Sequence, residues 1–506
     1  MSKTTLRILL NTGADNATAV TAPDAVPLTF AGLRAQVDDT IAALNSVGIG
    51  RNDRVAIVLP NCPEMAVAFM AIASGTASAP LNSAYRVDEF EFYLSDLRAK
   101  AMVIESGAEG PAVEAAKKAC VPLVRLTPTP AFGAGRFTLD VSAINGAPAA
   151  NGGAAQPDDI ALVLHTSGTT SRPKIVPLTQ TNLCASARNI GMVTGFTAAD
   201  RGLVITPLFH IHGLIAGVLA PLAAGGGVFV PGGFNALKFF GWMREAKPTW
   251  YTAVPTMHQA ILTRASKSAD VIAANPLRFI RSSSSSLPPQ VLAELEQVFN
   301  TRVIESYGMT EAAHQMASNL LLPGDRKPGT VGVAAGPEMG IMDSDGNLLP
   351  KGAIGEIVIK GDNVTPGYEN NPKANAEAFT NGWFRTGDQG VLDADGFISI
   401  TGRLKEIINR GGEKISPREV DEVLMNHPAV QQVVTFGIPH DKLGEEVGAV
   451  VVLREGQEAA ERDLRDFASK HLADFKVPKK ILFMAEIPKG ATGKLQRIGL
   501  AAKLGL

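Results

Sequence analysis

A short run of hydroxyl, glycine and basic residues at positions 166–174 has the composition of a phosphate-binding loop. It reads Thr-Ser-Gly-Thr-Thr-Ser-Arg-Pro-Lys, so backbone and hydroxyl donors are followed by Arg172 and Lys174. Such donors, backed by positive charge, are typical of sites that bind phosphate groups. The spacing is not that of a Walker A loop, and a serine- and threonine-rich surface turn is the alternative interpretation.

A second stretch combines an aromatic ring, a hydroxyl and a carboxylate within five residues. Tyr307, Thr310 and Glu311 follow an apolar run and enclose Gly308 and Met309. An aromatic face can stack on a base, a hydroxyl can contact a phosphate, and a carboxylate can bind a hard cation. On its own, the stretch has a simpler explanation, which is a helix start capped by Thr310.

Four further stretches carry charged residues at turns. Asp388 ends the sequence Arg-Thr-Gly-Asp and could accept hydrogen bonds from vicinal hydroxyls. The others are 402–406 (Gly-Arg-Leu-Lys-Glu), 409–417 (Asn-Arg-Gly-Gly-Glu-Lys-Ile-Ser-Pro) and 488–494 (Pro-Lys-Gly-Ala-Thr-Gly-Lys). Each alone is explained by a turn or a solvated loop. Six such stretches in one chain are not plausibly six coincidences.

The elements that must position these residues alternate between strand and helix patterns through the first two thirds of the chain. A strand is expected at 160–164, before the phosphate loop, and a helix at 177–190, after it. Similar patterns occur at 54–59, 64–74, 101–105, 111–120, 203–207, 211–223, 227–230, 236–246, 249–254, 255–264, 277–281, 288–298 and 302–305. This alternation favours parallel sheets, whose ligands bind at the carboxyl ends of the strands.

The pattern changes twice towards the C-terminus. After Pro323, short strands are separated by Gly, Asp and Pro, and Asp-Gly pairs at 345–346 and 395–396 are hairpin signals, so a β subdomain is expected. Beyond residue 402, helices and strands mix without strict alternation. The expected elements there are 417–426, 432–437, 447–454 and 459–471.

The length of 506 residues exceeds what one hydrophobic core usually serves. The expected fold class is α/β, with a large N-terminal domain of several subdomains over residues 1–401. It would contain two layered α/β sheets and the β subdomain. A small α+β domain would follow over residues 402–506.

Composition restricts the partners and the compartment. The 47 basic and 49 acidic residues nearly balance, which predicts no general attraction to nucleic acid or to an anionic membrane. Three widely spaced cysteines without a metal-ligand pattern favour a reducing compartment. The first ten residues contain too short an apolar patch for a secretory signal, so a cytoplasmic protein is expected. Residues 202–237 carry no charge, but prolines and glycines divide them, which argues against a membrane span.

Taken together, the six stretches resemble those of the adenylate-forming superfamily of acyl-CoA synthetases, firefly luciferases and peptide-synthetase adenylation domains. The resemblance extends over about residues 25–500, and its set of motifs is highly specific. It implies that a carboxylate attacks the α-phosphate of MgATP to give an acyl-adenylate and pyrophosphate. A thiol then displaces AMP, and coenzyme A is the expected thiol, since no carrier domain follows residue 506.

The resemblance also implies a role for each motif. Tyr307 would lie against adenine, Thr310 would contact the α-phosphate, and Asp388 with Arg403 would bind the ribose. Gly308 would also belong to the nucleotide-binding residues. The small domain would be mobile about a hinge at Lys405, which exchanges Lys494 for Gly411 and Gly412 at the site. Pyrophosphate would be held by the loop residues Thr166, Ser167, Gly168, Thr169, Thr170 and Lys174, and Mg²⁺ by Glu311 and Thr170.

This chemistry needs no nucleophilic side chain, because the substrate carboxylate attacks as an anion. The barrier lies in bringing two anions together, so positioning and cations should dominate. One unit charge at about 4 Å contributes about 4 kcal/mol at an effective dielectric constant near 20. Lys494, Thr310, Glu311 and His210 are the residues expected to act in catalysis.

The acyl site is expected to be unusually polar for this superfamily. His210 and His212 lie in Phe-His-Ile-His-Gly, a sequence similar to the acyl-site helix start, and His314 follows Thr310 by four residues. Hydroxyls replace the usual small apolar residues at Ser282, Ser283, Ser284 and Ser285. These groups could hold a second carboxylate, which cannot be buried without partners. Histidines and serines satisfied elsewhere in the core are the alternative.

Oxalate is the expected acid, and Ser171-Arg172 further resembles the oxalate:CoA ligase branch. Malonate is less favoured, because the one candidate guanidinium, Arg281, is expected to face elsewhere. Medium-chain and aromatic acids remain competitors. A nucleotide-binding regulator without turnover, or an adenylation domain feeding a carrier protein, are the other functions considered.

The remaining expectations concern partners. Small molecules are expected, namely the acid, ATP and coenzyme A, with no nucleic acid and no membrane. The sequence leaves a monomer and a homodimer open. Acetylation of Lys494 by a lysine acetyltransferase, reversed by a deacetylase, would remove its charge and is a candidate regulatory route.

Overall fold

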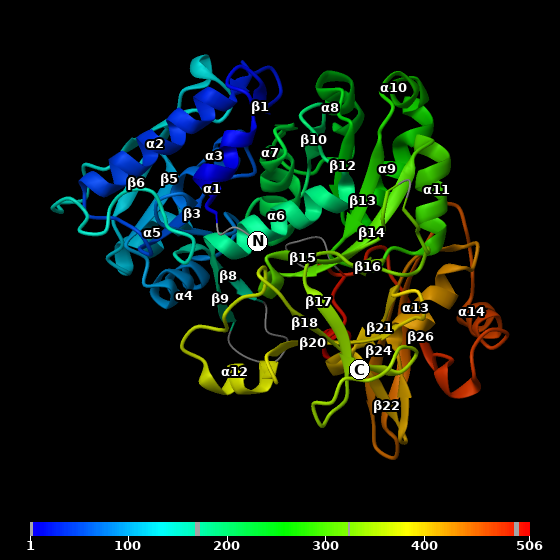
Figure 1. The fold of residues 1–506 in the computed structure, drawn as a ribbon. Coiled ribbons are helices and arrows are strands. Elements are labelled where there is room, and N and C mark those ends of the chain that lie inside the picture. Colours follow the sequence, from blue (N-terminus) through cyan, green and yellow to red (C-terminus); the bar gives the residue numbers. More distant parts are fainter. Residues whose placement is uncertain (1–3, 167–172, 322–323, 490–494) are drawn as a thin grey trace.

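The computed structural model describes residues 4–166, 173–321, 324–489 and 495–506. Among them, four β-sheets with helices packed on their faces form the molecule (Figure 1). Two large sheets lie side by side, and a β subdomain and a small C-terminal domain lie below them. The expected fold class, mixed α/β with a large N-terminal and a small C-terminal domain, is confirmed.

The first large sheet has seven strands in the order β7-β6-β5-β3-β4-β8-β9. Its inner strands are parallel, and both edge strands, β7 and β9, are antiparallel to their neighbours. The strands are β3 (Arg54–Val58), β4 (Ala77–Pro80), β5 (Ala101–Glu105), β6 (Leu123–Pro128), β7 (Phe137–Asp140), β8 (Ile160–Thr166) and β9 (Lys174–Thr179).

The strand β9 corrects one expectation, since a helix was predicted from residue 177. Residues 174–179 instead pair antiparallel with β8, and Pro177 is tolerated because β9 is an edge strand. The helix α6 (Gln180–Thr194) begins three residues later than predicted. Thr179 caps it, because its hydroxyl accepts from the Asn182 backbone N–H at 3.1 Å while the Asn182 side chain accepts from the Thr179 N–H.

The second large sheet has nine strands in the order β16-β15-β14-β13-β12-β10-β11-β1-β2. The strands from β14 to β1 are parallel, so their carboxyl ends share one edge. The strands are β1 (Thr18–Thr21), β2 (Leu28–Thr29), β10 (Arg201–Val204), β11 (Gly227–Phe229), β12 (Trp250–Ala253), β13 (Phe279–Ser283), β14 (Arg302–Met309), β15 (His314–Ser318) and β16 (Val333–Ala334).

One hydrophobic core joins the two large sheets. Helix α6 contacts β8 and β9 of the first sheet and β15 of the second, and α3 (Pro63–Ala73) is buried over nearly its whole surface. The remaining helices of this part are α1 (Leu6–Leu9), α2 (Phe30–Ser46), α4 (Val87–Leu97), α5 (Pro111–Lys118), α7 (Ala220–Ala223), α8 (Phe239–Ala246), α9 (Pro255–Ala265), α10 (Ala269–Ala274) and α11 (Pro289–Phe299).

The uncharged segment 202–237 folds as short pieces rather than as one long helix. It contains β10, a π-helix η3 (His212–Leu219), α7 and β11. None of the described helices has both the length and the hydrophobicity that crossing a bilayer requires. The π-helix matters for the site, because such segments occur disproportionately at functional positions.

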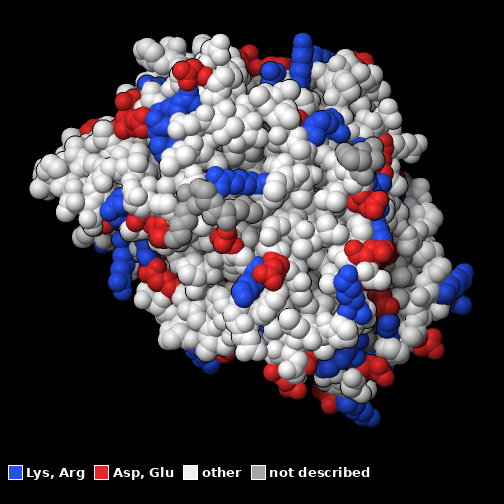
Figure 2. Space-filling view, in the orientation of Figure 1, with Lys and Arg blue, Asp and Glu red and all other residues white. Residues whose placement is uncertain are grey.

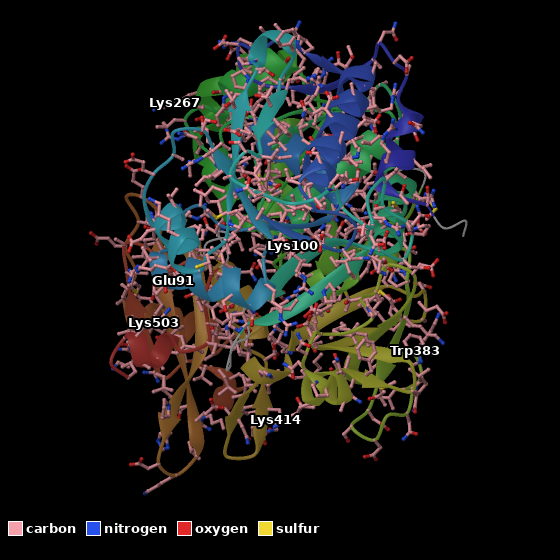
Figure 3. All side chains as sticks on the ribbon, turned by 90° about the vertical axis from the view of Figure 1, so that its left-hand side faces the viewer. Glu91, Lys100, Lys267, Trp383, Lys414 and Lys503 are labelled. Atoms are coloured by element: carbon pink, nitrogen blue, oxygen red, sulfur yellow. The ribbon has the colours of Figure 1, made fainter. Side chains whose placement is uncertain are left out.

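The β subdomain and the small domain each contain a five-stranded sheet. In a view turned by 90°, Trp383 of the β subdomain and Lys503 of the small domain lie on opposite sides of the lower half (Figure 3). The first sheet comprises β17 (Glu338–Met342), β18 (Ile354–Lys360), β19 (Phe379–Thr380), β20 (Trp383–Leu392) and β21 (Ile398–Arg403), with helix α12 (Pro372–Ala378). The second comprises β22 (Ile408–Arg410), β23 (Glu413–Ile415), β24 (Val430–His440), β25 (Gly444–Leu453) and β26 (Lys480–Phe483), with helices α13 (Pro417–Met425), α14 (Glu461–Ala468) and α15 (Leu500–Lys503).

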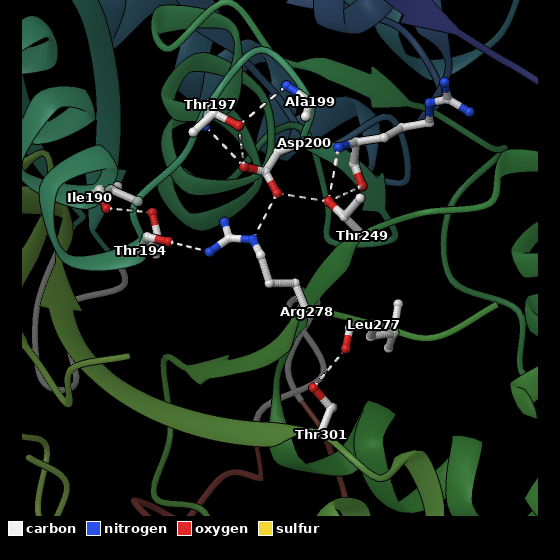
Figure 4. A network of polar contacts seen from close by, with 10 residues as sticks. Ile190, Thr194, Thr197, Ala199, Asp200, Thr249, Leu277, Arg278 and Thr301 are labelled. Carbon is white, nitrogen blue, oxygen red and sulfur yellow. Dashed lines mark hydrogen bonds and ion pairs between the residues drawn. The ribbon is translucent and has the colours of Figure 1, made fainter. Parts of the chain in front are cut away.

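An ion-pair network ties the amino ends of three strands in the second sheet (Figure 4). The Asp200 carboxylate, just before β10, accepts from Arg278 Nε and from the Thr249 hydroxyl, both at 2.9 Å. Arg278 also donates to the Thr194 carbonyl at 2.8 Å. The network lies at the opposite end of the strands from the candidate site and serves the fold.

On the surface, positive and negative side chains are interspersed across the face in view (Figure 2). This distribution agrees with the near-balanced charge of the sequence. Any anion-binding site must therefore be local.

Candidate functional site

The predicted nucleotide residues converge on a sharp reversal of the chain. Strand β14 ends at Met309, a one-turn 3-10 helix η5 (Thr310–Ala312) follows, and β15 returns antiparallel from His314. Thr310 opens this turn without capping it, because the cap position is Met309 and no side-chain cap bond forms. The alternative that Thr310 is only a helix cap is therefore not what the structure shows.

Tyr307, Asp388 and Arg403 form one connected group from three strands. The Tyr307 hydroxyl donates to Asp388 Oδ2 at 2.5 Å, and Arg403 Nε donates to Asp388 Oδ1 at 3.1 Å. Burial, and then the neighbouring carboxylate, raise the pKa of Tyr307 well above its usual value. The ion pair raises the pKa of Arg403. The ring of Tyr307 and both oxygens of Asp388 are thus fixed in place.

The preceding residues of the Arg-Thr-Gly-Asp motif hold Asp388. Arg385 Nε donates to Glu356 Oε2 at 2.7 Å, and the Gly387 N–H donates to the other Glu356 oxygen at 2.9 Å. Gly387 has φ +74°, a left-handed conformation that glycine adopts without strain. The motif is therefore a clamp on strand β18, which explains its residue types.

Glu311 is a buried carboxylate with one hydroxyl partner. Tyr368, in the loop between β18 and α12, donates its hydroxyl to Glu311 Oε1 at 2.8 Å. Lys174 Nζ lies 4.1 Å from the centre of the Tyr368 ring. Burial raises the pKa of Glu311. A buried carboxylate that feels the charge of a lysine is suited to a site for a hard divalent cation and phosphate.

The donor set around Glu311 fits Mg²⁺ bound in the manner usual for nucleotides. No three His, Cys, Asp or Glu side chains among the described residues form a metal cage. Mg²⁺ commonly takes one or two carboxylates and fills its other positions with phosphate oxygens and water. Glu311 supplies such a carboxylate.

Gly308 is required for packing. A Cβ atom at this position would lie 1.6 Å from the carbonyl oxygen of His314, so only glycine allows β14 and β15 to approach each other here. The glycine thereby sets the distance between Tyr307 on β14, a predicted nucleotide residue, and His314 on β15, a predicted acyl residue.

The phosphate loop connects two paired strands. Thr166 and Lys174 are directly opposite each other at the ends of β8 and β9. The residues between them, which include Ser167, Gly168, Thr169 and Thr170, lie outside the described residues. Lys494 also lies outside them.

In the small domain, the predicted Gly411 and Gly412 form the turn of the β22–β23 hairpin. Their φ angles are +59° and +99°, and the pairing of Arg410 with Glu413 leaves these two residues as the loop. A two-residue turn of this kind favours glycine at both positions. Lys405 lies in the 3-10 segment η6 (Leu404–Glu406), between the β subdomain and this hairpin.

Several predicted acyl residues meet in a buried polar cluster. The His212 ring stacks on His314, with centroids 4.9 Å apart and an interplanar angle of 14°. His212 Nδ1 lies 3.0 Å from Ser284 Oγ, and His212 Nε2 lies 2.7 Å from Thr252 Oγ1. We call this group, with Arg281 and Gln315, the His212 cluster.

Arg281 corrects an expectation, because it was predicted to face away from the acyl site. Its guanidinium lies inside the His212 cluster: Nη1 is 3.5 Å from His212 Nε2 and from Thr252 Oγ1, and Nη2 donates to Gln315 Oε1 at 3.0 Å. The reason is strand register, because Arg281 of β13 is the direct partner of Thr252 on β12, and their side chains share a face.

Only one of the predicted serines joins the cluster. Ser284 contacts His212, whereas Ser283 donates to the Ser306 carbonyl at 2.9 Å. Ser282 alternates with Arg281 along β13 and so points to the opposite face of the sheet, and Ser285 is exposed. The run of serines therefore indicated the region of the polar cluster, but not which serine belongs to it.

His210 is partly buried and precedes the π-helix η3 by two residues. Its Nδ1 accepts from the His212 backbone N–H at 3.3 Å. This hydrogen bond holds the backbone of His212, the central residue of the His212 cluster.

Backbone strain marks the same place. Ser284 has φ +73° and His314 has φ +92°, both in the left-handed region that residues other than glycine rarely adopt. Such conformations persist where the surrounding structure holds them, and they concentrate at ligand sites. Both residues contact His212.

Sequence reasoning missed Thr252, Gln315 and Tyr368. Thr252 and Gln315 lie inside buried strands, and Tyr368 lies in a loop without a recognisable motif. A signal existed for Gln315 alone, because it is polar within an apolar run next to His314.

Comparison with known proteins agrees with this geometry. The family of AMP-binding enzymes matches residues 11–369, and the C-terminal domain of AMP-binding enzymes matches residues 419–494. The chain is 46% identical to the oxalate–CoA ligase of Arabidopsis thaliana, covering 93% of this chain and 92% of that protein. It is 43% identical to the oxalate–CoA ligase of Saccharomyces cerevisiae, covering 88% and 86%.

Among solved structures, ATP-bound MatB from Rhodopseudomonas palustris superposes with a TM-score of 0.88 at 29% identity, covering 99% of both chains. The fold, the arrangement of the nucleotide residues and both family matches lead to one conclusion. The chain belongs to the family of AMP-binding enzymes.

Proposed function

We propose that the protein is an AMP-forming acid:CoA ligase that converts oxalate, ATP and coenzyme A to oxalyl-CoA, AMP and pyrophosphate. The observation that carries the proposal is the His212 cluster, a buried polar group beside the nucleotide residues. Its member His314 follows Glu311 by three residues in the chain. The similarity to two oxalate–CoA ligases supports the same acid.

In the first half-reaction, the acid's carboxylate would attack the α-phosphate of ATP. The ring of Tyr307 and the pair Asp388–Arg403 would bind the nucleoside, with Asp388 oxygens accepting from the ribose hydroxyls. Thr310 would donate to the α-phosphate from the turn η5. The site supplies positions and charges rather than a base, because the attacking group is already an anion.

Glu311, with Thr170, would hold Mg²⁺, which supplies charge neutralisation on the phosphates. Tyr368 orients Glu311 through its hydroxyl, which donates to Oε1. Lys174, beside Tyr368, would contact the phosphates from the opposite side.

The acyl half would bind oxalate through the His212 cluster. Ser284, positioned by His212, and His314 would face the carboxylate that does not react, and His210 would lie beside the reacting one. An alkyl or aromatic acid would place an apolar surface against these polar side chains and give the Ser284 hydroxyl no acceptor, at a cost of about 1–3 kcal/mol. The cluster therefore favours a small, doubly charged acid over a medium-chain or aromatic one.

In the second half-reaction, the small domain would turn about Lys405. Lys494 would leave the site, and the Gly411–Gly412 hairpin would approach the incoming thiol. Residues 1–401 and 402–506 would then be the two moving bodies. Lys494→Ala should abolish adenylation but still convert supplied oxalyl-adenylate and CoA to oxalyl-CoA. Equal loss of both half-reactions would contradict this division of labour.

The deciding experiment is an acid panel. Purified protein with ATP, Mg²⁺ and CoA is assayed for AMP release with oxalate, malonate, acetate and octanoate. Oxalate should give the highest kcat/KM, and octanoate the lowest. A higher kcat/KM with octanoate would defeat the polar-site proposal. Pyrophosphate release without CoA separates an enzyme from a regulator that only binds nucleotide.

Acetylation of Lys494 would remove the charge that adenylation needs, so it would switch off the first half-reaction alone. Deacetylase treatment of protein purified from cells should then raise AMP release.

A cytoplasmic location is proposed from the cysteine usage, because Cys62, Cys120 and Cys184 are free thiols. Fractionation of cells tests the location, and sedimentation distinguishes a monomer from a homodimer.

A further inference from the structure

Arg281 is a fully buried cation whose partners are all neutral. Its relative exposure is 0%, and its hydrogen-bond partners are Gln315, Thr252 and His212. Within the described residues, no carboxylate acts on its pKa, which responds to burial alone, and its Nε atom has no hydrogen-bond partner. Burial lowers its pKa to about 9. Buried charges are normally paired, so this one requires an explanation.

Two other arginines of this chain show the ordinary arrangement, in which a carboxylate pairs with the guanidinium. Arg278, three residues earlier at the other end of the same strand, is paired with Asp200 (Figure 4). Arg497 of the small domain donates to both Glu406 and Asp421. The chain therefore builds carboxylate partners for arginines elsewhere, and Arg281 differs from them in lacking one.

We propose that Arg281 is a specificity-determining positioning residue whose missing counter-charge is the second carboxylate of a small dicarboxylate substrate. The inference rests on the proposed function, because it assigns a charge requirement to the acid of that same site. Arg281 acts through its neighbours, since its side chain lies behind His212 as seen from Ser284.

The hydrogen bonds allow the effect of Arg281 to be traced atom by atom. Arginine can only donate, so the Thr252 hydroxyl accepts from Arg281 Nη1 and donates its own proton to His212 Nε2. His212 Nε2 is then the acceptor nitrogen of a neutral ring, and Nδ1–H donates to Ser284 Oγ. The Ser284 hydroxyl proton is left to donate outward.

A chain of donors that starts at a buried cation and ends on an outward hydroxyl selects for an anion. A carboxylate accepts and cannot donate, so it matches the last donor, and its charge compensates Arg281. A neutral group of the same size would satisfy the hydroxyl but leave the guanidinium uncompensated. The strained backbone at Ser284 and His314 holds both ends of this arrangement.

The test compares Arg281→Met with Arg278→Met in the full-length protein. For each variant, kcat/KM is measured with oxalate and with acetate, and Tm is measured without acid and with oxalate plus AMP. Arg281→Met should lower the oxalate-to-acetate ratio at least about thirtyfold, as expected for loss of a buried charge partner. It should also abolish the oxalate-induced rise in Tm. Without acid, its Tm should be unchanged or higher, because an uncompensated charge has been removed.

Arg278→Met is the matched control, because it removes a paired arginine from the opposite end of the strand. It should lower Tm and keep the oxalate-to-acetate ratio within about twofold of wild type. Arg281→Lys retains the charge and should keep the oxalate-to-acetate ratio within about tenfold of wild type. This variant also tests the charge requirement if Arg281→Met does not fold.

The proposal is overturned if Arg281→Met keeps the wild-type ratio, or if oxalate and acetate activities fall equally. It is also overturned if Arg281→Lys folds but loses the preference as fully as Met. Failure of the proposed function looks different. In that case wild-type protein itself prefers another acid and shows no rise in Tm with oxalate. The Arg281 inference is then judged by the acid-free Tm and by the ratio of malonate to acetate.

Discussion

The two halves of the site compensate their charges in different ways. In the nucleotide half, Asp388 is paired with Arg403 and hydrogen-bonded by Tyr307, so its geometry exists before any ligand arrives. In the proposed acyl half, Arg281 is buried among neutral groups. The proposed nucleotide half thus contains its own counter-charges, whereas in our proposal the substrate supplies the counter-charge of the acyl half.

This difference teaches where selectivity resides. Every acid handled by the enzyme uses the same nucleotide, so a preformed nucleotide half serves all of them equally. Discrimination between acids requires a cost that only the correct acid removes, and an uncompensated buried cation provides such a cost. Substitutions in the nucleotide half should therefore lower activity with every acid alike. Substitutions in the His212 cluster should act on oxalate selectively.

The largest effect is expected at Glu311. Glu311→Gln removes the charge proposed to hold Mg²⁺ while keeping the Tyr368 hydrogen bond, so kcat for adenylation should fall about a thousandfold. The loss should be the same for oxalate and acetate, as measured by pyrophosphate release. Tyr368→Phe, which removes only the orienting hydroxyl, is the matched control and should cost about tenfold. A loss confined to oxalate would break the comparison.

A smaller effect is expected at Asp388. Asp388→Asn loses the ion pair with Arg403 and part of the proposed ribose grip, so KM for ATP should rise about thirtyfold to a hundredfold. Tyr307→Phe removes one hydrogen bond to the same carboxylate and should raise KM less than tenfold. Initial rates at varied ATP with each acid measure both. An unchanged KM for ATP would remove Asp388 from the nucleotide site.

The nucleotide half was predictable because its motifs are local. Arg385 to Asp388 is one clamp closed by Glu356, and Tyr307 to Glu311 is one turn, so sequence neighbours are also spatial neighbours. The alternation of strands and helices likewise predicted the layers, since each pattern reflects local burial. The start of α6 was misplaced because the apolar edge strand β9, with Pro177 in it, resembles a helix start.

The acyl half could not be predicted in the same way. Its members come from η3, β12, β13 and β15, and register between strands decides which of them meet. Strand β13 is buried on both faces, so Phe279 to Ser283 show no alternation that would tell which way Arg281 points. The sequence showed which polar residues are present, but not toward which face of the sheet their side chains point.

A selective effect is expected at His212. His212→Phe keeps an aromatic ring against His314 but loses both nitrogens, so the link between Arg281 and Ser284 is broken. The kcat/KM for oxalate should fall about tenfold to thirtyfold relative to that for acetate. The KM for ATP should stay near the wild-type value. Equal losses with both acids would mean that the cluster serves the fold and not the choice of acid.

Glu305 extends the comparison to a buried anion. This carboxyl, on β14 facing the small domain, accepts from the Gly329 N–H at 3.3 Å, and Arg418 of α13 acts on it only through its charge. Burial raises the pKa of Glu305 from 4.5 to about 7. A second backbone hydrogen bond, from Leu287, also lowers its pKa, but burial has the larger effect. Glu305 is thus a buried ionisable group like Arg281, and no ligand is proposed to compensate it.

The smallest effect on catalysis, and a distinct effect on stability, is therefore expected there. Because the folded-state pKa lies above the unfolded one, the stabilising contribution is full below pH 4.5 and is lost as pH rises through 7. The stability lost between pH 4.5 and pH 8 is about 3 kcal/mol, at about 1.4 kcal/mol per unit of pKa difference. Glu305→Gln, which stays neutral, should raise Tm at pH 8, change it little at pH 5, and leave the oxalate-to-acetate ratio unaltered. Calorimetry at the two pH values measures this, and a lower Tm at pH 8 would mean that Arg418 already compensates the carboxylate.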